Sequence, residues 1–218
     1  MIVVHHLNNS RSQRVLWLLE ELGLDYEIVR YERDARLFAP PELKAVHPLG
    51  KSPVITDGGV TVAETGAIVD YILETYAEGR LVPQAAAERR AMRYWLHYAE
   101  GSAMPLLLLK LITTQIPRRV PFFIRPVAKL ISKGLEKSMV TPGLQTHMAF
   151  WEEALTPGGW FAGSEFSAAD IMMSFPLEAA VSRAGAGERA ALRTFVDRIH
   201  QRPAYRRALE RGGPYAYA

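Results

Sequence analysis

Strand-like and helix-like segments alternate only in the first eighty residues of this chain, and the later segments have the period of a helix. Short β-branched runs predict strands over 2–6, 26–31, 53–56 and 60–63, with a hairpin turn at 57–59. Apolar residues at helical spacing predict helices over 10–22 and 64–76. The order β-α-β followed by β-β-α predicts a small mixed sheet with helices on its faces. The fold class is therefore α/β plus all-α.

The segment 78–87 separates the two regions and has no regular period. Beyond it, helical stripes run through 88–112, 121–138, 144–155 and 192–199, and no convincing strand pair follows residue 84. A length of 218 residues suits one large domain or two small ones. We predict a mixed domain over 1–80 and an all-helical domain over 88–218.

Composition excludes several kinds of chemistry. The chain has no cysteine, so disulfides, thiolate metal sites and a cysteine nucleophile are ruled out. Its six histidines lack metal-ligand spacing, so we expect no bound metal. A net charge of +3 is too small to predict a nucleic-acid partner. No signal-peptide pattern and no apolar run of roughly 18 residues is present, so we expect a cytoplasmic protein without integral membrane association.

The predicted helix over 121–138 has a basic ridge formed by Arg125, Lys129, Lys133 and Lys137. Such a ridge suits a helix on a membrane surface, or the solvated side of a helix that packs on a core, and the second interpretation is favoured. On that interpretation the following residues turn inward: Val127, Leu130, Ile131 and Leu135.

Polar residues mark the starts of three predicted helices. Asn8, Asn9 and Ser10 lie between the first strand and the first helix, where one of them caps the helix or where the helix N-terminus holds an anion. The pair 64–65, Glu-Thr, opens a helix directly after a strand in the same way. Ser167-Ala-Ala-Asp170 has the form of a capping box, which is a structural feature.

Pro53 directly precedes a short apolar strand. This position is unusual, because proline has no backbone N–H to donate to a neighbouring strand. Together with the two polar helix starts, Pro53 completes three regions whose order and spacing resemble a glutathione transferase. The stretches "HLNNSRSQRVLWLLEELGLDYEIVRYERD", "APPELKAVHPLGKSPVI" and "YAEGS" look most like the GTT-type fungal and bacterial branch. The resemblance extends over the whole chain, and it implies a thioredoxin-like first domain, a helical second domain and a homodimer.

This resemblance also implies where glutathione binds. It makes Pro53 a cis-proline, lets Val54 pair with the cysteinyl part, and places Glu64 and Thr65 at the γ-glutamyl end. Lys51 would reach the glycine carboxylate. The implied glutathione-binding residues are Lys51, Ser52, Pro53, Val54, Glu64 and Thr65.

The thiol of glutathione would supply the reactive sulfur that the chain lacks. Two residues match thiol-activating positions of different family branches, and we favour Ser10 over Asn9. The resemblance implies that a hydrophobic electrophile or a peroxide binds between the domains, against Tyr94, Tyr98 and Met104. We therefore expect glutathione conjugation or glutathione-dependent peroxide reduction. The alternative is a non-catalytic module of the same fold that binds partner proteins.

Overall fold

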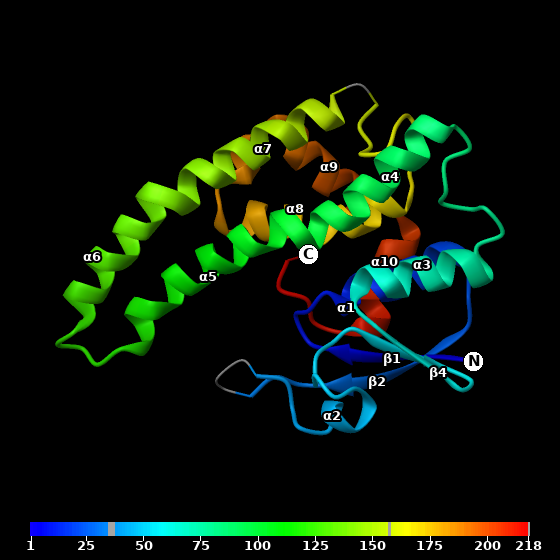
Figure 1. The fold of residues 1–218 in the computed structure, drawn as a ribbon, viewed down its shortest axis with the longest axis horizontal. Helices are drawn as coiled ribbons and strands as arrows, with labels where there is room; N and C mark the ends of the chain where they lie inside the picture. Colours follow the sequence, from blue (N-terminus) through cyan, green and yellow to red (C-terminus); the bar gives the residue numbers. More distant parts are fainter. Residues whose placement is uncertain (35–37, 157, 218) are drawn as a thin grey trace.

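The computed structural model describes residues 1–34, 38–156 and 158–217 (Figure 1). Its first part contains β1 (Ile2–Leu7), α1 (Ser12–Leu22), β2 (Tyr26–Tyr31), α2 (Leu43–Val46), β3 (Val54–Asp57), β4 (Val60–Ala63) and α3 (Thr65–Tyr76). Its second part contains α4 (Ala86–Tyr98), α5 (Met104–Arg119), α6 (Arg125–Leu135), α7 (Thr141–Leu155), α8 (Ala168–Arg183), α9 (Ala190–His200) and α10 (Pro203–Gly212).

The four strands form one sheet in the order β2-β1-β3-β4. β1 pairs in parallel with β2, and β3 runs antiparallel to both β1 and β4. Helices α1 and α3 cover one side of the sheet, and α2 lies on the other (Figure 1). Helix α1 ends where Gly23 adopts a φ of 62°, a left-handed conformation that glycine adopts without steric cost. The predicted mixed sheet is confirmed.

Helix α8 lies at the centre of the helical part and is buried from Ala168 to Ala180. Its start has the predicted capping box. The Asp170 carboxylate accepts hydrogen bonds of 2.8 Å from the backbone N–H groups of Phe161 and Ser167. Burial raises the pKa of Asp170 to about 6, although these hydrogen bonds oppose the shift.

Helix α10 connects the end of the chain back to the first part of the fold. It packs against α1, and a Cβ added at Gly212 would lie 2.8 Å from the Gln13 side chain. The absence of a side chain at this position therefore allows the two helices to approach closely. Helix α10 therefore supports α1, and α1 in turn packs on β1.

Helices α5 and α6 form a hairpin that extends from the rest of the molecule (Figure 1). The prediction that the apolar residues of α6 turn inward is wrong. Val127, Leu130 and Ile131 are 57%, 74% and 60% exposed, and Leu135 is 37% exposed. The reason is that α6 packs mainly on α5 and buries only Ala128 and Ser132 of its own residues. A periodic apolar face indicates a helix but does not show that another element covers that face.

The helix expected over 88–112 is longer than predicted and not uniform. Between α4 and α5 the chain forms a π-helical turn, η1, at Ala99–Ala103. A second π-helical turn, η2, joins α6 to α7 at Glu136–Val140. Among the described residues, no helix is long and apolar enough to cross a membrane. The domain limits 1–80 and 88–218 stay a prediction.

Candidate functional site

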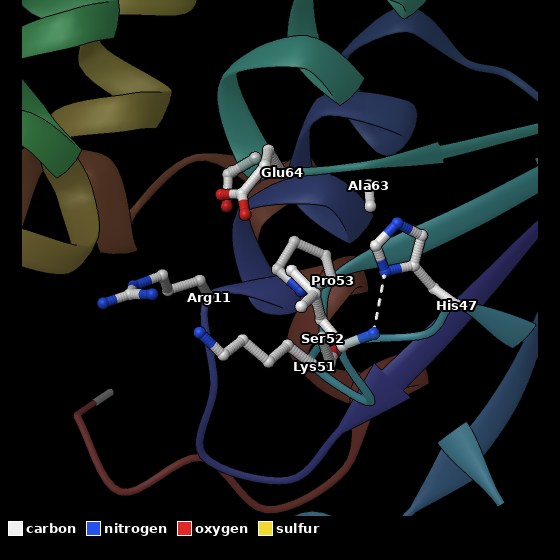
Figure 2. Close-up of a pocket in the computed structure, with 9 residues that line it drawn as sticks. Arg11, His47, Lys51, Ser52, Pro53, Ala63 and Glu64 are labelled. Atoms are coloured by element: carbon white, nitrogen blue, oxygen red, sulfur yellow. Dashed lines mark hydrogen bonds between the residues drawn. The ribbon is translucent and has the colours of Figure 1, made fainter. Parts of the chain in front are cut away.

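A pocket of about 100 Å³ opens beside the start of β3 (Figure 2). Segments from several parts of the sequence contribute to it: the start of α1, the loop before β3, the end of β4 and the start of α3. It is lined by Arg11, His47, Leu49, Lys51, Ser52, Pro53, Ala63, Glu64 and Thr65. Five of the six residues that the resemblance assigns to glutathione binding are in this set.

Pro53 lines the pocket at the point where the loop enters β3. The Ser52–Pro53 peptide bond is cis, as the resemblance implies. The Ser52 hydroxyl donates a 2.8 Å hydrogen bond to the backbone carbonyl of His5 in β1. Because Pro53 directly precedes β3, the central pair of strands fixes the position of the loop that lines the pocket.

Glu64 and Thr65 lie at the turn from β4 into α3. Glu64 has a φ of 71° and a ψ of 127°, a combination that is uncommon for any residue except glycine. Such a backbone conformation costs about 1–3 kcal/mol and persists only where its surroundings hold it. The Glu64 carbonyl accepts a 2.9 Å hydrogen bond from the N–H of Ile68 inside α3. The Glu64 side chain is exposed, whereas Thr65 is buried.

Three charged side chains surround the opening of the pocket. The charged ends of Arg11, Lys51 and Glu64 point to the same side of Pro53 (Figure 2). Two cations and one carboxylate therefore face a common space. This arrangement suits a ligand with two carboxylates and one ammonium group, each of which finds an opposite charge.

Glu100 connects this pocket to the helical part. Its carboxylate, in η1, lies 3.2 Å from Arg11 Nε and also pairs with Arg14. Burial alone would raise the pKa of Glu100, but Arg14 and Arg11 together hold it below the usual value. Arg14 also donates a 2.7 Å hydrogen bond to the Met172 carbonyl in α8, and its side chain is only 1% exposed.

Neither predicted thiol activator lines this pocket. Ser10 is buried, and its Oγ accepts a 3.2 Å hydrogen bond from the Ser12 N–H in the first turn of α1. A second hydrogen bond, of 2.7 Å, joins the hydroxyls of Ser10 and Ser12. Asn9 Oδ1 accepts a 2.8 Å hydrogen bond from the N–H of Ala216 near the C-terminus. Both residues have a structural partner, and their catalytic role stays a prediction.

Val54 lies within the sheet rather than in the pocket. It is fully buried, and its neighbours across the two adjoining strands are His5 and Ala63. Ser52, on the other side of Pro53, is the residue that lines the pocket. The pairing of Val54 with glutathione stays a prediction. The position of Val54 inside the sheet does not favour it.

The three residues predicted to bind the electrophile do not line the pocket either. The rings of Tyr94 and Tyr98 stack with their centroids 5.5 Å apart, and both contact the ring of Phe150 in α7. Tyr98 is only 8% exposed, and it accepts a 3.0 Å hydrogen bond from the Trp151 indole N–H. Met104 is buried at the start of α5. Burial against other helices limits the surface that Tyr98 and Met104 present to a ligand.

The pocket also contains residues that sequence reasoning did not identify. Arg11 directly follows the polar triplet 8–10, but arginine is not among the residue types that cap a helix start, so the local pattern assigns it no role. His47 and Leu49 belong to the quoted stretch before Pro53, and the Leu49 N–H approaches His47 Nδ1 at 3.4 Å. Ala63 precedes Glu64 at the end of β4. In the sequence, the only indication that these residues belong to the pocket is that they lie next to the motifs that carry the resemblance.

Comparison with known proteins identifies the family. Residues 1–74 match the family model described as "Glutathione S-transferase, N-terminal domain". The chain is 36% identical to glutathione S-transferase 3 of Schizosaccharomyces pombe over 83% of its own length and 74% of the relative's. It is 35% identical to glutathione S-transferase 1 of Saccharomyces cerevisiae over 84% and 82% of the two chains.

A solved structure gives the same result. The crystal structure of a glutathione S-transferase from Actinobacillus pleuropneumoniae has a TM-score of 0.82 to this protein. The two chains share 31% sequence identity, and the match covers 100% of this chain and 95% of that one. The resemblance noted in the sequence is thereby confirmed, and this chain belongs to the glutathione S-transferase family.

Proposed function

We propose that this protein is a glutathione transferase that activates the thiol of glutathione for attack on hydrophobic electrophiles. The observation that carries the proposal is the pocket in which the charged ends of Arg11, Lys51 and Glu64 point to the same side of Pro53 (Figure 2). Glutathione is an extended tripeptide with two carboxylates and one ammonium group. Its charges therefore complement the two cations and one carboxylate of the pocket.

The proposed orientation assigns one part of the tripeptide to each side of the pocket. The γ-glutamyl ammonium group binds the Glu64 carboxylate, beside Thr65. The glycine carboxylate binds Lys51, as the resemblance implies. The cysteinyl backbone lies along Ser52 and Pro53, a contact that we move from Val54 because Ser52 lines the pocket. Arg11 pairs with Glu100 through Nε, so its other guanidinium N–H groups are the ones that reach the γ-glutamyl carboxylate or the sulfur.

The reaction requires the thiolate rather than the thiol. A free thiol has a pKa of about 8.5, and nearby cations or the N-terminus of a helix lower that value. Ser10 stays our proposed activator, because Ser12 can donate to its oxygen and leave the Ser10 proton available to the sulfur. Asn9 is the alternative. The thiol proton leaves to water, and the sulfur forms a bond to the electrophilic carbon of the second substrate. In a substitution the bond from that carbon to the leaving group breaks and the leaving group departs as an anion; in an addition a π bond breaks and the neighbouring carbon takes a proton from water.

Peroxide reduction is a second proposed activity at the same pocket. There the thiolate attacks the terminal peroxide oxygen, the O–O bond breaks, the alkoxide leaves and takes a proton to become an alcohol, and the glutathione sulfur becomes a sulfenic acid. The thiol of a second glutathione then displaces water from this sulfenic acid, which completes the reduction and forms glutathione disulfide. The chain has no cysteine, so both thiols come from glutathione.

Affinity and turnover together test the proposed function. Calorimetry should detect glutathione binding, and a chromogenic aromatic electrophile and an organic hydroperoxide should each be tested as second substrates. Turnover of either substrate that depends on glutathione supports the enzyme. Glutathione binding with turnover of neither substrate would favour the non-catalytic module. The absence of glutathione binding would overturn the proposed site.

A homodimer is the proposed assembly, because the family branches that this chain resembles pair the mixed domain of one subunit with the helical domain of the other. Sedimentation at micromolar concentration should therefore give twice the chain mass of 24.4 kDa. A species of single-chain mass over the whole concentration range would contradict the dimer.

A further inference from the structure

A second hollow lies between α5 and α6 and shares no lining residue with the first pocket. We name it the hairpin groove. It has a volume of about 770 Å³. It is lined by Lys110, Thr113, Thr114, Pro117, Arg118, Arg125, Lys129, Ser132, Lys133 and Glu136.

Sequence spacing explains why the cations meet in this groove. Lys110, Thr114 and Arg118 follow one another at intervals of four residues along α5. On α6, Arg125, Lys129 and Lys133 have the same spacing. Residues four apart lie on the same face of a helix. Because α5 and α6 pack side by side as a hairpin, the two rows face a common space.

Most of this charge lacks a counterion in the part of the chain that the structure describes. Lys110 pairs with Glu136 at 2.9 Å, and Arg125 donates one long hydrogen bond to a backbone carbonyl. Among the described residues, Arg118, Lys129 and Lys133 have no ion pair or side-chain hydrogen bond. Five cations and one carboxylate therefore line the groove, and their mutual repulsion disfavours the empty groove.

Ser132 adds an independent indication of a ligand. Its side chain is 4% exposed, and its Oγ is buried without a hydrogen-bond partner in the described structure. A buried hydroxyl without a partner costs about 1–3 kcal/mol. Ser132 nevertheless lines the groove, and rotation of its side chain about χ1 would turn the hydroxyl toward an acceptor atom bound there. The hydroxyl of Thr113, by contrast, already donates to Glu136 at 2.8 Å.

We propose that the hairpin groove binds a phosphate-bearing ligand. Phosphate oxygens are strong acceptors, and a diphosphate offers enough of them for Lys129, Lys133, Arg118 and the Ser132 hydroxyl together. The groove volume of about 770 Å³ accommodates a diphosphate or a phospholipid headgroup. Either source presents the same chemistry to the groove.

The experiment separates these two sources. Binding of inorganic pyrophosphate is measured by calorimetry on the full chain. Binding to vesicles of phosphatidylcholine, with and without phosphatidylglycerol, is measured by co-sedimentation. The groove variant is Lys129→Gln/Lys133→Gln. Its matched control is Arg90→Gln/Arg93→Gln, which removes two exposed cations of α4 outside the groove.

Wild type and control should bind pyrophosphate, or vesicles that contain phosphatidylglycerol, and the groove variant should bind at least tenfold more weakly. Pyrophosphate binding identifies a soluble ligand, whereas binding only to the anionic vesicles identifies a lipid headgroup. Equal weakening of the groove and control variants would show a general charge effect and overturn the proposal. No binding of either probe to the wild type would overturn it as well.

Ser132→Ala provides a second readout that a purely structural hydroxyl would not give. Because Ser132 Oγ has no partner in the described structure, its removal should leave the thermal midpoint unchanged or raise it. The same variant should bind the successful probe several-fold more weakly. A lower thermal midpoint together with unchanged binding would remove Ser132 from the proposed site.

Discussion

Arg11 Nε lies 3.2 Å from Glu100 Oε2, so a cation of the candidate glutathione pocket is held by a carboxylate of the helical part. The same carboxylate pairs with the buried Arg14, which also bonds α8. The two parts of the chain are thus joined beside the pocket by one residue of the π-helical turn η1. A change at Glu100 should alter both stability and ligand binding.

We expect Glu100→Gln to lower the free energy of unfolding by about 3 kcal/mol, because Arg14 would remain buried without its counterion. It should also raise the KM for glutathione, since Arg11 loses its fixed position. Glu152→Gln is the matched control, as Glu152 pairs with Arg189 where both side chains are about 30% exposed. Its cost should stay below about 1 kcal/mol. Equal losses in denaturant titrations of the two variants would contradict the argument.

Glu64 permits a test that separates binding from folding. Glu64→Ala should weaken glutathione binding at least tenfold, because a charged hydrogen-bond partner contributes about 1.5–3 kcal/mol. Glu64→Gly should weaken binding equally but raise the thermal midpoint, since glycine accommodates the φ of 71° without strain. Wild-type affinity in calorimetry of either variant would remove Glu64 from the proposed site.

The thiol activator is identified by titrating the bound thiolate through its ultraviolet absorbance. Ser10→Ala should raise the pKa of bound glutathione and slow conjugation at neutral pH by roughly tenfold, with glutathione affinity little changed. Asn9→Ala should leave the titration unchanged, because the hydrogen bond from the Ala216 N–H holds the Asn9 side chain beside the C-terminal segment. The opposite pattern would transfer the role to Asn9. If neither variant shifts the pKa, Arg11→Ala should do so.

Stability should depend on pH through His6. Burial, together with the nearby Arg30, lowers the pKa of His6 to about 4, while the unfolded value is 6.5. The unfolded chain therefore binds a proton that the folded chain does not, and stability is lost as the pH falls below 6.5.

Between pH 7 and pH 5 this loss should be about 2 kcal/mol. The control is His6→Asn, which can retain a hydrogen bond to Ser12 but does not titrate. Denaturant titrations at the two pH values should therefore show a smaller loss for His6→Asn. An equal loss in wild type and variant would exclude His6 as the cause.

Local sequence patterns were sufficient to predict much of the fold. Alternating β-branched residues, the Gly23 cap and the Ser167–Asp170 capping box each act within a few neighbouring residues, so the sequence contains the whole signal. The exposure of Leu130 and Ile131 could not be predicted in this way, because it depends on whether a third element covers the α5–α6 hairpin. Sequence periodicity does not contain that information.

The candidate pocket was predictable where its residues belong to motifs and not elsewhere. Pro53 and Glu64 could be placed because short motifs position them through the adjoining strand or helix. Arg11 lies at the pocket because of the turn before α1 and because it pairs with Glu100. Glu100 is 89 positions away in the chain, so no local pattern indicates this pairing. The burial of Tyr98 could not be predicted for a related reason, since its hydrogen bond to Trp151 belongs to the packing of separate helices.

The α5–α6 hairpin also gives the molecule a strong electric asymmetry. Residues 104–140 contain seven lysines and arginines and one glutamate, while the whole chain has a net charge of +3. The remainder of the chain is consequently acidic, with a net charge of −3. Toward a cation-exchange resin the protein should behave as far more basic than its total charge indicates, with the hairpin contacting the resin first. This preference in orientation should fade as added salt shortens the Debye length toward about 3 Å.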